Sequence, residues 1–159
     1  MGGYWITRFR MQEGINWIER LLELPACTNM PSLNARLHAY LGRLAELSGD
    51  YASARTALMT AVMLARTLKE TDAIALALSY MGLLTRTLGD SAQARTFFTQ
   101  SAELYAVLEQ RHGEVLNRAY AANCNYDLGD FDEAEAQYLL ALDRASALED
   151  AFVKAYLLW

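Results

Sequence analysis

A Gly-Asp pair recurs three times in the sequence, and it is the first place to look for chemistry. The pairs Gly49-Asp50, Gly89-Asp90 and Gly129-Asp130 follow one another at intervals of 40 residues. Glycine-containing loops beside carboxylates bind phosphate groups or metal ions in many proteins. The same pair also suits a turn between helices, because glycine takes a left-handed backbone cheaply and Asp caps the next helix. The spacing of the three pairs along the chain indicates whether they form a ligand site or turns.

The other residues whose types could support catalysis or metal binding lack the neighbouring residues that such a site requires. His38 and His112 fall at unrelated points of the 40-residue period, and neither has the His or Cys neighbours of a zinc site. Asp130, Asp132 and Glu133 stand at an expected helix start, where carboxylates complement the helix dipole, and a calcium loop needs more oxygen ligands. The sequence has no Gly-x-x-x-x-Gly-Lys phosphate loop and no Gly-x-Ser-x-Gly elbow. We expect a protein that is not an enzyme and has no catalytic residues, no cofactor and no metal.

The amino-acid composition of the chain restricts the kinds of partner that it can bind. A net charge of −5, a pI near 5.0 and 14 scattered basic residues argue against direct nucleic-acid binding by this segment, since phosphates require clustered Lys and Arg. No apolar stretch has the ~18 residues of a membrane span, and the first residues lack the order of a signal peptide. Cys27 and Cys124 stand alone, as in proteins of a reducing compartment. We expect a cytoplasmic protein that does not enter a membrane.

The 40-residue period extends well beyond the Gly-Asp pairs and predicts an all-helical repeat. Stepping by 40 aligns tyrosines, small residues and large apolar residues: Tyr40, Tyr80 and Tyr120; Ala54, Ala94 and Ala134; Leu58, Phe98 and Tyr138. Apolar residues recur at intervals of three and four, which is the helical pattern. Each unit is expected to have a first helix and a second helix, over 34–48 and 51–69, 72–88 and 91–110, and 114–128 and 131–149. One hairpin cannot bury both of its apolar faces, so the units should stack into a solenoid.

These residues resemble the tetratricopeptide repeat (TPR). The family places Leu-Gly midway along the first helix, as at Leu41-Gly42, and Gly-Asp-aromatic at the turn, as at Gly49 and Gly129. The family repeat has 34 residues and this one has 40, so its helices should be longer. The resemblance implies an all-α fold, a right-handed α-α superhelix formed as a TPR-like solenoid of antiparallel helix pairs.

A single TPR-like solenoid is expected over residues 1–159, and both of its ends resemble cut repeats. The full repeats are 34–69, 72–110 and 114–149, with the end of an earlier repeat at 4–24 and the start of a truncated one at 150–159. The opening "YWITRFRMQEGINWIERLLEL" is similar to helical repeat regions of bacterial AfsR-like and LuxR-type regulators that carry a signal-transduction NTPase module. The chain is therefore interpreted as an excised segment of a longer regulator.

The resemblance also implies where a partner binds, because the first helices of such a solenoid line its concave face. The positions carried over form a tyrosine row with nearby arginines: Arg36, Tyr40, Arg43, Tyr80, Leu83, Arg86, Tyr120, Asn123 and Tyr126. This groove suits a protein or peptide with apolar and acidic groups. The alternative is that the tyrosines only pack between helices. Met59, Met63 and Met81 are expected to fill the core rather than to form a Met-rich groove.

Two functions remain open at this point. The first is a protein/peptide-interaction module, the TPR sensor or scaffold segment of a larger bacterial transcriptional regulator involved in signal transduction. The alternative is an effector-binding domain that takes a small ligand or a signalling peptide in the concave groove. Self-association through the truncated ends is a third hypothesis.

The recurring Gly-Asp pairs are best interpreted as turns. Each glycine would end a first helix in the left-handed conformation, and each aspartate would cap the second helix, at about 1 kcal/mol per cap. Gln93 and Glu133 follow their aspartates by three residues, as in a capping box.

Overall fold

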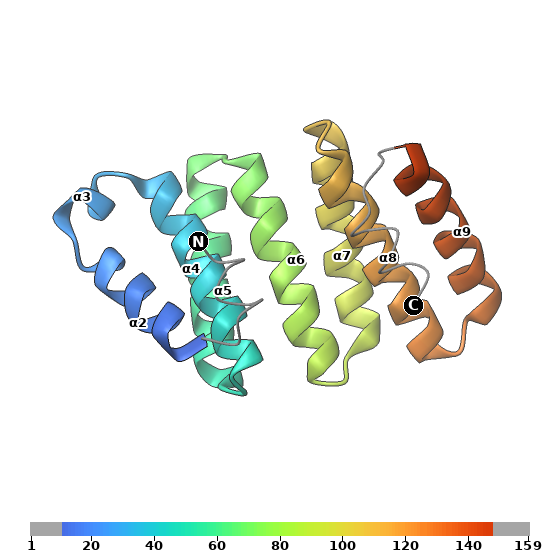
Figure 1. The fold of residues 1–159 in the computed structure, drawn as a ribbon, viewed down its shortest axis with the longest axis horizontal. Coiled ribbons are helices and arrows are strands. Elements are labelled where there is room, and N and C mark those ends of the chain that lie inside the picture. The colour runs from blue at the N-terminus through green and yellow to red at the C-terminus, as the bar shows by residue number, and fades with distance from the viewer. Residues whose placement is uncertain (1–10, 148–159) are drawn as a thin grey trace. The chain divides into compact units, whose positions relative to one another are not determined.

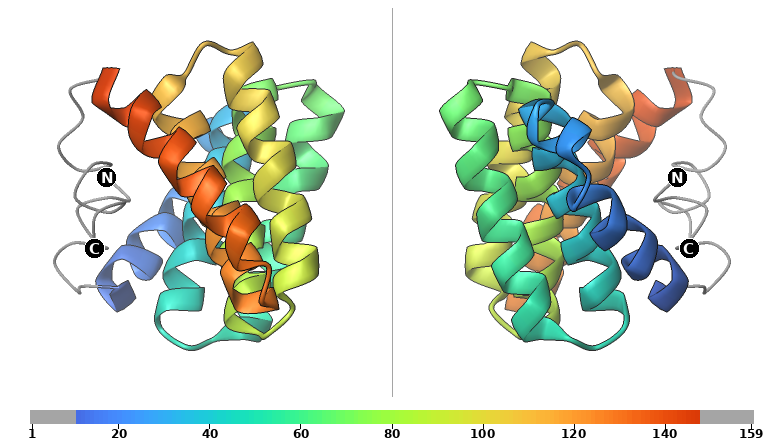
Figure 2. Two further views of the ribbon diagram at one scale, coloured as in Figure 1. Left: turned by 90° about the vertical axis from the view of Figure 1, so that its right-hand side faces the viewer. Right: turned by 90° about the vertical axis from the view of Figure 1, so that its left-hand side faces the viewer.

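The computed structural model describes residues 11–147, and this range is helical without a strand (Figure 1). A helix and a short helix come first, α2 (Met11–Leu22) and α3 (Pro25–Thr28). Three helix pairs follow: α4 (Pro31–Leu47) with α5 (Tyr51–Leu68), α6 (Thr71–Thr87) with α7 (Ser91–Val107), and α8 (Arg111–Leu128) with α9 (Phe131–Ala147). Figure 2 looks onto α9 in its left view and onto α2 in its right view.

The helices match the predicted pairs closely and differ mainly at their ends. α4 begins at Pro31, three residues before the expected start, because proline suits the first turn of a helix, where its missing N–H is not needed. The short helix α3 was not predicted, and Pro25 likewise stands at its start. Residues 4–10 of the expected segment 4–24, residues 148–149 of the expected third repeat, and the truncated repeat expected at 150–159 lie outside the described residues.

The chain divides into two compact units, Met1–Leu84 and Thr85–Trp159, with the boundary inside α6. In the first unit α4 packs along α5, and α2 packs on α4. In the second unit α8 packs against both α7 and α9. Alanine is the most frequent buried residue in both units, so backbones approach closely.

Gly42 shows how close that approach is. A Cβ atom added at Gly42 would lie 2.5 Å from Cγ of Leu58 and 3.1 Å from the carbonyl oxygen of Ala54. Ala54 and Leu58 are completely buried on α5. The small residue at Gly42 therefore sets the distance between α4 and α5, as the sequence predicts.

The three Gly-Asp turns share one hydrogen-bonded geometry. The φ angles of Gly49, Gly89 and Gly129 are 87°, 91° and 85°, all left-handed. At the first turn the N–H of Gly49 donates to Glu46 (3.0 Å) and the N–H of Asp50 donates to Ala45 (3.0 Å). The same pair of bonds recurs at the other two turns, and together they form the Schellman motif that ends a helix.

The aspartates then start the second helices. The Oδ1 atom of Asp50 accepts from the N–H of Ser53 (3.0 Å), and that of Asp90 accepts from the N–H of Gln93 (2.9 Å). The predicted capping box would have the Gln93 side chain accept a hydrogen bond from the N–H of Asp90. That N–H donates to the carbonyl of Thr85 instead. The Glu133 side chain instead accepts from Gln137. These carboxylates belong to turns, and no group of His, Cys, Asp and Glu in residues 11–147 is arranged to hold a metal.

Two further turns have the same backbone with no glycine. Lys69 and Glu109 have φ angles of 56° and 57°, and they follow α5 and α7. The N–H of Glu70 donates to Ala65 (3.0 Å), and that of Gln110 to Tyr105 (2.9 Å), as in the Gly-Asp turns. A side chain at a left-handed position is strained, so these turns between pairs are less favourable than the turns within them.

Exchanging residue types at the two kinds of turn should change stability in opposite directions. Gly89→Ala should lower the free energy of unfolding by about 1–2 kcal/mol, because the added Cβ meets no atom within 4 Å and the strain comes only from φ. Lys69→Gly should raise that free energy by up to about 1 kcal/mol, since the relieved strain exceeds the extra entropy of the unfolded glycine. Urea denaturation measures both, and changes of the same sign would contradict the turn geometry.

Candidate partner-binding surface

All nine residues of the predicted groove lie on the first helices of the pairs. They are Arg36, Tyr40 and Arg43 on α4, Tyr80, Leu83 and Arg86 on α6, and Tyr120, Asn123 and Tyr126 on α8. The first five belong to the first unit and the last four to the second. Each group is therefore described within its own unit.

In the first unit the tyrosines pack between helices while staying partly exposed. The rings of Tyr40 and Tyr80 have centroids 6.1 Å apart and are tilted by 56°. Tyr40 packs on the cluster that contains Leu37 and Leu44, and Tyr80 packs on clusters that contain Leu58 and Ala77. The packing alternative therefore accounts for part of each side chain, and both residues remain partly exposed to solvent.

The arginines of the first unit already have acidic partners. Arg36 on α4 pairs with Asp72 on α6, and Arg43 pairs with Glu46 one turn later on α4. The Arg36 side chain remains 43% exposed, whereas the Arg43 side chain is 19% exposed. An acidic partner molecule would reach Arg36 more easily than Arg43.

In the second unit the predicted residues make contacts with both neighbouring helices. The Tyr120 ring lies 5.1 Å from that of Phe98 on α7, and Asn123 accepts a hydrogen bond from the Tyr138 hydroxyl on α9. Tyr126 is 61% exposed, and its ring meets the Phe131 ring edge-on at 5.2 Å.

Arg86 makes a two-bond ion pair with Asp127. Its Nε and Nη2 atoms donate to the two Asp127 carboxylate oxygens, at 2.6 and 3.1 Å, and the Ser91 hydroxyl donates to the same carboxylate at 3.1 Å. The hydrogen bond from Arg86 holds the pKa of Asp127 below its usual range. A partner's carboxylate would have to displace Asp127 to bind Arg86.

Cys27, Cys124 and His38 are not arranged as a reactive site in the described part of the chain. Cys27 and Cys124 are both buried free thiols, and burial raises the pKa of Cys124 to about 11, which keeps it protonated near neutral pH. His38 is partly buried on α4, burial lowers its pKa, and its Nδ1 atom has no hydrogen-bond partner within the described residues. These groups are packed residues of the helices.

The prediction that Met59 and Met63 fill the core was wrong. Each is 60% exposed on α5, whereas Met81 packs against the cluster of Ala54, Leu58 and Leu84. The inward face of α5 passes through Leu58, Ala61 and Ala65. Met59 follows Leu58 by one residue, and one residue is about 100° around a helix, so it points outward.

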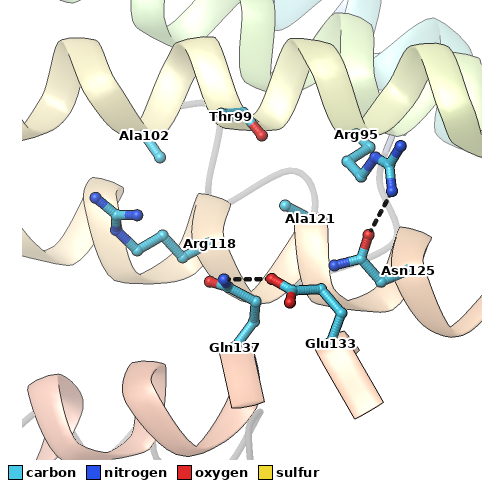
Figure 3. A pocket seen from close by; sticks show the side chains of 8 residues that line it. All are labelled: Arg95, Thr99, Ala102, Arg118, Ala121, Asn125, Glu133 and Gln137. Carbon is cyan, nitrogen blue, oxygen red and sulfur yellow. Dashed lines mark hydrogen bonds between the residues drawn. The ribbon is translucent and has the colours of Figure 1, made fainter. Parts of the chain in front are cut away.

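The structure also contains a polar pocket that the sequence analysis missed. It measures about 380 Å³ and lies among α7, α8 and α9 (Figure 3). Its lining residues are Arg95, Thr99 and Ala102 on α7, Arg118, Ala121 and Asn125 on α8, and Glu133 and Gln137 on α9. Tyr120 and Asn123 do not line it, because two residues correspond to roughly 200° around α8.

A break in the repeat was the signal that could have revealed this pocket. One period earlier, the positions of Arg118 and Ala121 hold Leu78 and Met81, which are buried and half-buried. The third repeat thus replaces bulky apolar residues by a cation and a small side chain.

Comparison with known proteins gives a structural relationship and no sequence family. No family model matches the chain, and no curated protein matches it. Its structure is similar to that of a Rap protein complexed with competence and sporulation factor, with a TM-score of 0.83 and 19% sequence identity. The match covers 90% of this chain and 40% of the Rap chain.

The chain has a TPR-like fold. The similarity confirms the predicted all-α class, the right-handed α-α superhelix built from antiparallel helix pairs. The chain spans 40% of the length of the Rap protein, so the similarity concerns only part of that protein. No helix among residues 11–147 is long and apolar enough to cross a membrane.

The burial of His38 should make stability depend on pH. Because burial lowers the pKa of folded His38 below 6.5, the unfolded chain binds its proton more readily. The contribution of His38 to stability is complete above pH 6.5 and is lost as the pH falls from there toward the folded pKa. His38→Leu, the residue type found one period later at Leu78, should reduce the loss of stability between about pH 7 and pH 5. Urea midpoints with equal pH slopes in both proteins would contradict this.

Proposed function

We propose that this chain is a non-enzymatic module that binds a protein or a peptide through its first helices. The observation that carries the proposal is the TPR-like fold, which at a TM-score of 0.83 matches a Rap structure holding competence and sporulation factor. Solenoids of helix pairs present extended surfaces that proteins use for binding.

The nine residues of the predicted groove supply suitable chemistry for such a partner. Tyr40, Tyr80 and Tyr126 offer aromatic surface with a polar hydroxyl, which is a common composition of interfaces. Arg36 and Arg86 are 43% and 37% exposed, and each is paired with an aspartate from another helix. A partner with acidic groups would exchange with those aspartates, so its binding should weaken with salt.

Within a cell, this module would be the sensor or scaffold part of a larger bacterial regulator of transcription, acting in the cytoplasm. The basis is the similarity of the opening helix to AfsR-like and LuxR-type regulators, together with the fold. A second candidate is an effector-binding domain for a small ligand or a signalling peptide. The factor present in the matched Rap structure favours that candidate.

The role of the nine groove residues on the first helices, the first-helix surface, can be tested with two double variants. Each removes two positive charges, one from the first helices and the other from α5. Arg36→Gln with Arg86→Gln changes first helices, whereas Arg55→Gln with Arg66→Gln removes two exposed arginines from α5. Affinity capture from the source cells, followed by quantitative mass spectrometry, should recover a partner with the wild type and the α5 variant. Recovery with the first-helix variant should fall about tenfold, which is about 1.4 kcal/mol.

Equal recovery with both variants would contradict the role of the first helices. Hydrolysis of ATP by the purified chain, or binding of duplex DNA in fluorescence anisotropy, would contradict the non-enzymatic assignment and the absence of nucleic-acid binding. Sedimentation at several concentrations separates a partner from a second copy of the chain, because self-association depends on concentration.

A further inference from the structure

The polar pocket of the second unit has a fixed, buried donor at one end. Asn125 is 5% exposed, and its Oδ1 atom accepts from Nη1 of Arg95 at 2.9 Å. A guanidinium only donates hydrogen bonds, so Oδ1 has to face Arg95 and the amide nitrogen faces away from it. In Figure 3 that nitrogen points toward the middle of the pocket. From that position it can donate to an acceptor on a ligand.

The opposite end of the pocket carries an excess of positive charge. Nε of Arg118 donates to Oε1 of Glu114 at 3.0 Å, and Arg144 donates to the same oxygen. The Glu114 side chain is 10% exposed, and the two arginines share its single negative charge. One positive charge therefore remains at this end, and the ion pair holds the Arg118 side chain in place.

The part of the pocket toward Asn125 has an excess of negative charge instead. Arg95 lies 3.5 Å from the Asp130 carboxylate, which offsets its charge. Glu133, which lines the pocket between Arg118 and Asn125, carries one more negative charge. Gln137 donates to Oε1 of Glu133 at 2.8 Å and leaves the second carboxylate oxygen as an acceptor. A cationic group is favoured beside Glu133, and an anionic group is favoured beside Arg118.

The spacing of the two ends sets the length of the ligand. Arg118 and Asn125 are seven residues apart on α8, which is about 10 Å along the helix. Figure 3 shows Arg118 at one end, Arg95 and Asn125 at the other, and Glu133 and Gln137 between them. An extended peptide covers ~3.3–3.6 Å per residue, so a ligand of two or three residues fits within this distance. A volume of about 380 Å³ suits a ligand of that size.

We propose that this pocket binds a free di- or tripeptide in extended form. The terminal carboxylate lies on Arg118, the terminal ammonium lies on Glu133, and a main-chain carbonyl accepts from Asn125. This site is separate from the first-helix surface, since none of the nine groove residues lines it. The proposal does not depend on the proposed partner of that surface.

Titration of the ¹⁵N-labelled chain with alanine oligomers tests the proposal by NMR. Ala-Ala-Ala and Ala-Ala should shift the amide signals of the pocket residues with a Kd of about 1 mM or tighter. Free alanine is too short to reach both ends, and N-acetyl-Ala-Ala-Ala and Ala-Ala-Ala amide each lack one charge. All three should bind at least about tenfold more weakly.

Matched variants separate the pocket from general stability. Arg118→Gln and Arg144→Gln each remove one guanidinium from Glu114, but only Arg118 lines the pocket. Arg118→Gln should weaken Ala-Ala-Ala binding about tenfold and Arg144→Gln should not. Glu133→Gln should weaken it similarly, and Glu135→Gln, an exposed change on the same helix, should not.

A substitution that fills the pocket provides a further check. Ala121→Met introduces the residue type found one period earlier at Met81, and it should abolish binding while the chain stays folded. Lack of a saturable shift with either peptide up to about 10 mM would overturn the proposal. Equal affinity for the N-acetylated peptide would overturn the assignment of the ammonium to Glu133.

Discussion

At the first two Gly-Asp turns, one aspartate closes the first helix of a pair with its backbone N–H and opens the second with its carboxylate. Asp50 and Asp90 make both bonds, at 2.9 to 3.1 Å. The turn is possible because the preceding glycine takes a left-handed φ. It fixes the two helices of a pair antiparallel and in a defined register, so that Gly42 meets Ala54 and Leu58. Every other contact within the pair follows from that register.

Since the turns fix the register, side chains at other points of the period are free to differ between repeats. The position of Leu78 is occupied by Arg118 in the third repeat, and that of Met81 by Ala121. Buried leucine and methionine contribute about 1.5–3 kcal/mol each relative to exposure, so their loss reduces packing there. The third repeat has instead a polar pocket with opposite charges at its two ends. Exchange of packing for polar groups is characteristic of functional sites.

The sequence predicts the elements that depend on local patterns. The helix pairs, the left-handed glycines and the small residue at Gly42 all follow from the three- and four-residue spacing and from the period. The interactions that define the surface do not follow in this way, because their members come from different helices. Arg36 pairs with Asp72, and Arg86 pairs with Asp127. Each arginine has an exposed acidic residue nearer in sequence, and only the packing of helices selects the partner.

Some differences between the predicted and the observed elements have a simpler origin. The short helix α3 lies between Pro25 and Pro31, where a proline suggests a break although it is also suited to a helix start. Met59 and Met63 are apolar and one helical turn apart, so their spacing fits a buried stripe as well as an exposed one. The direction of the stripe depends on the neighbouring Leu58 and Ala61, which occupy the buried side.

The three repeats share one architecture, and the third has replaced packing residues by polar ones. The triple variant Arg118→Leu, Ala121→Met and Asn125→Thr tests this, because it gives the third repeat the residues of the second. Glu114 keeps Arg144 as its partner in that protein. Urea denaturation should show a free energy of unfolding about 1 kcal/mol or more above that of the wild type, because apolar side chains fill the pocket. A decrease of the same size would contradict the account, since it would mean that the positions are not equivalent.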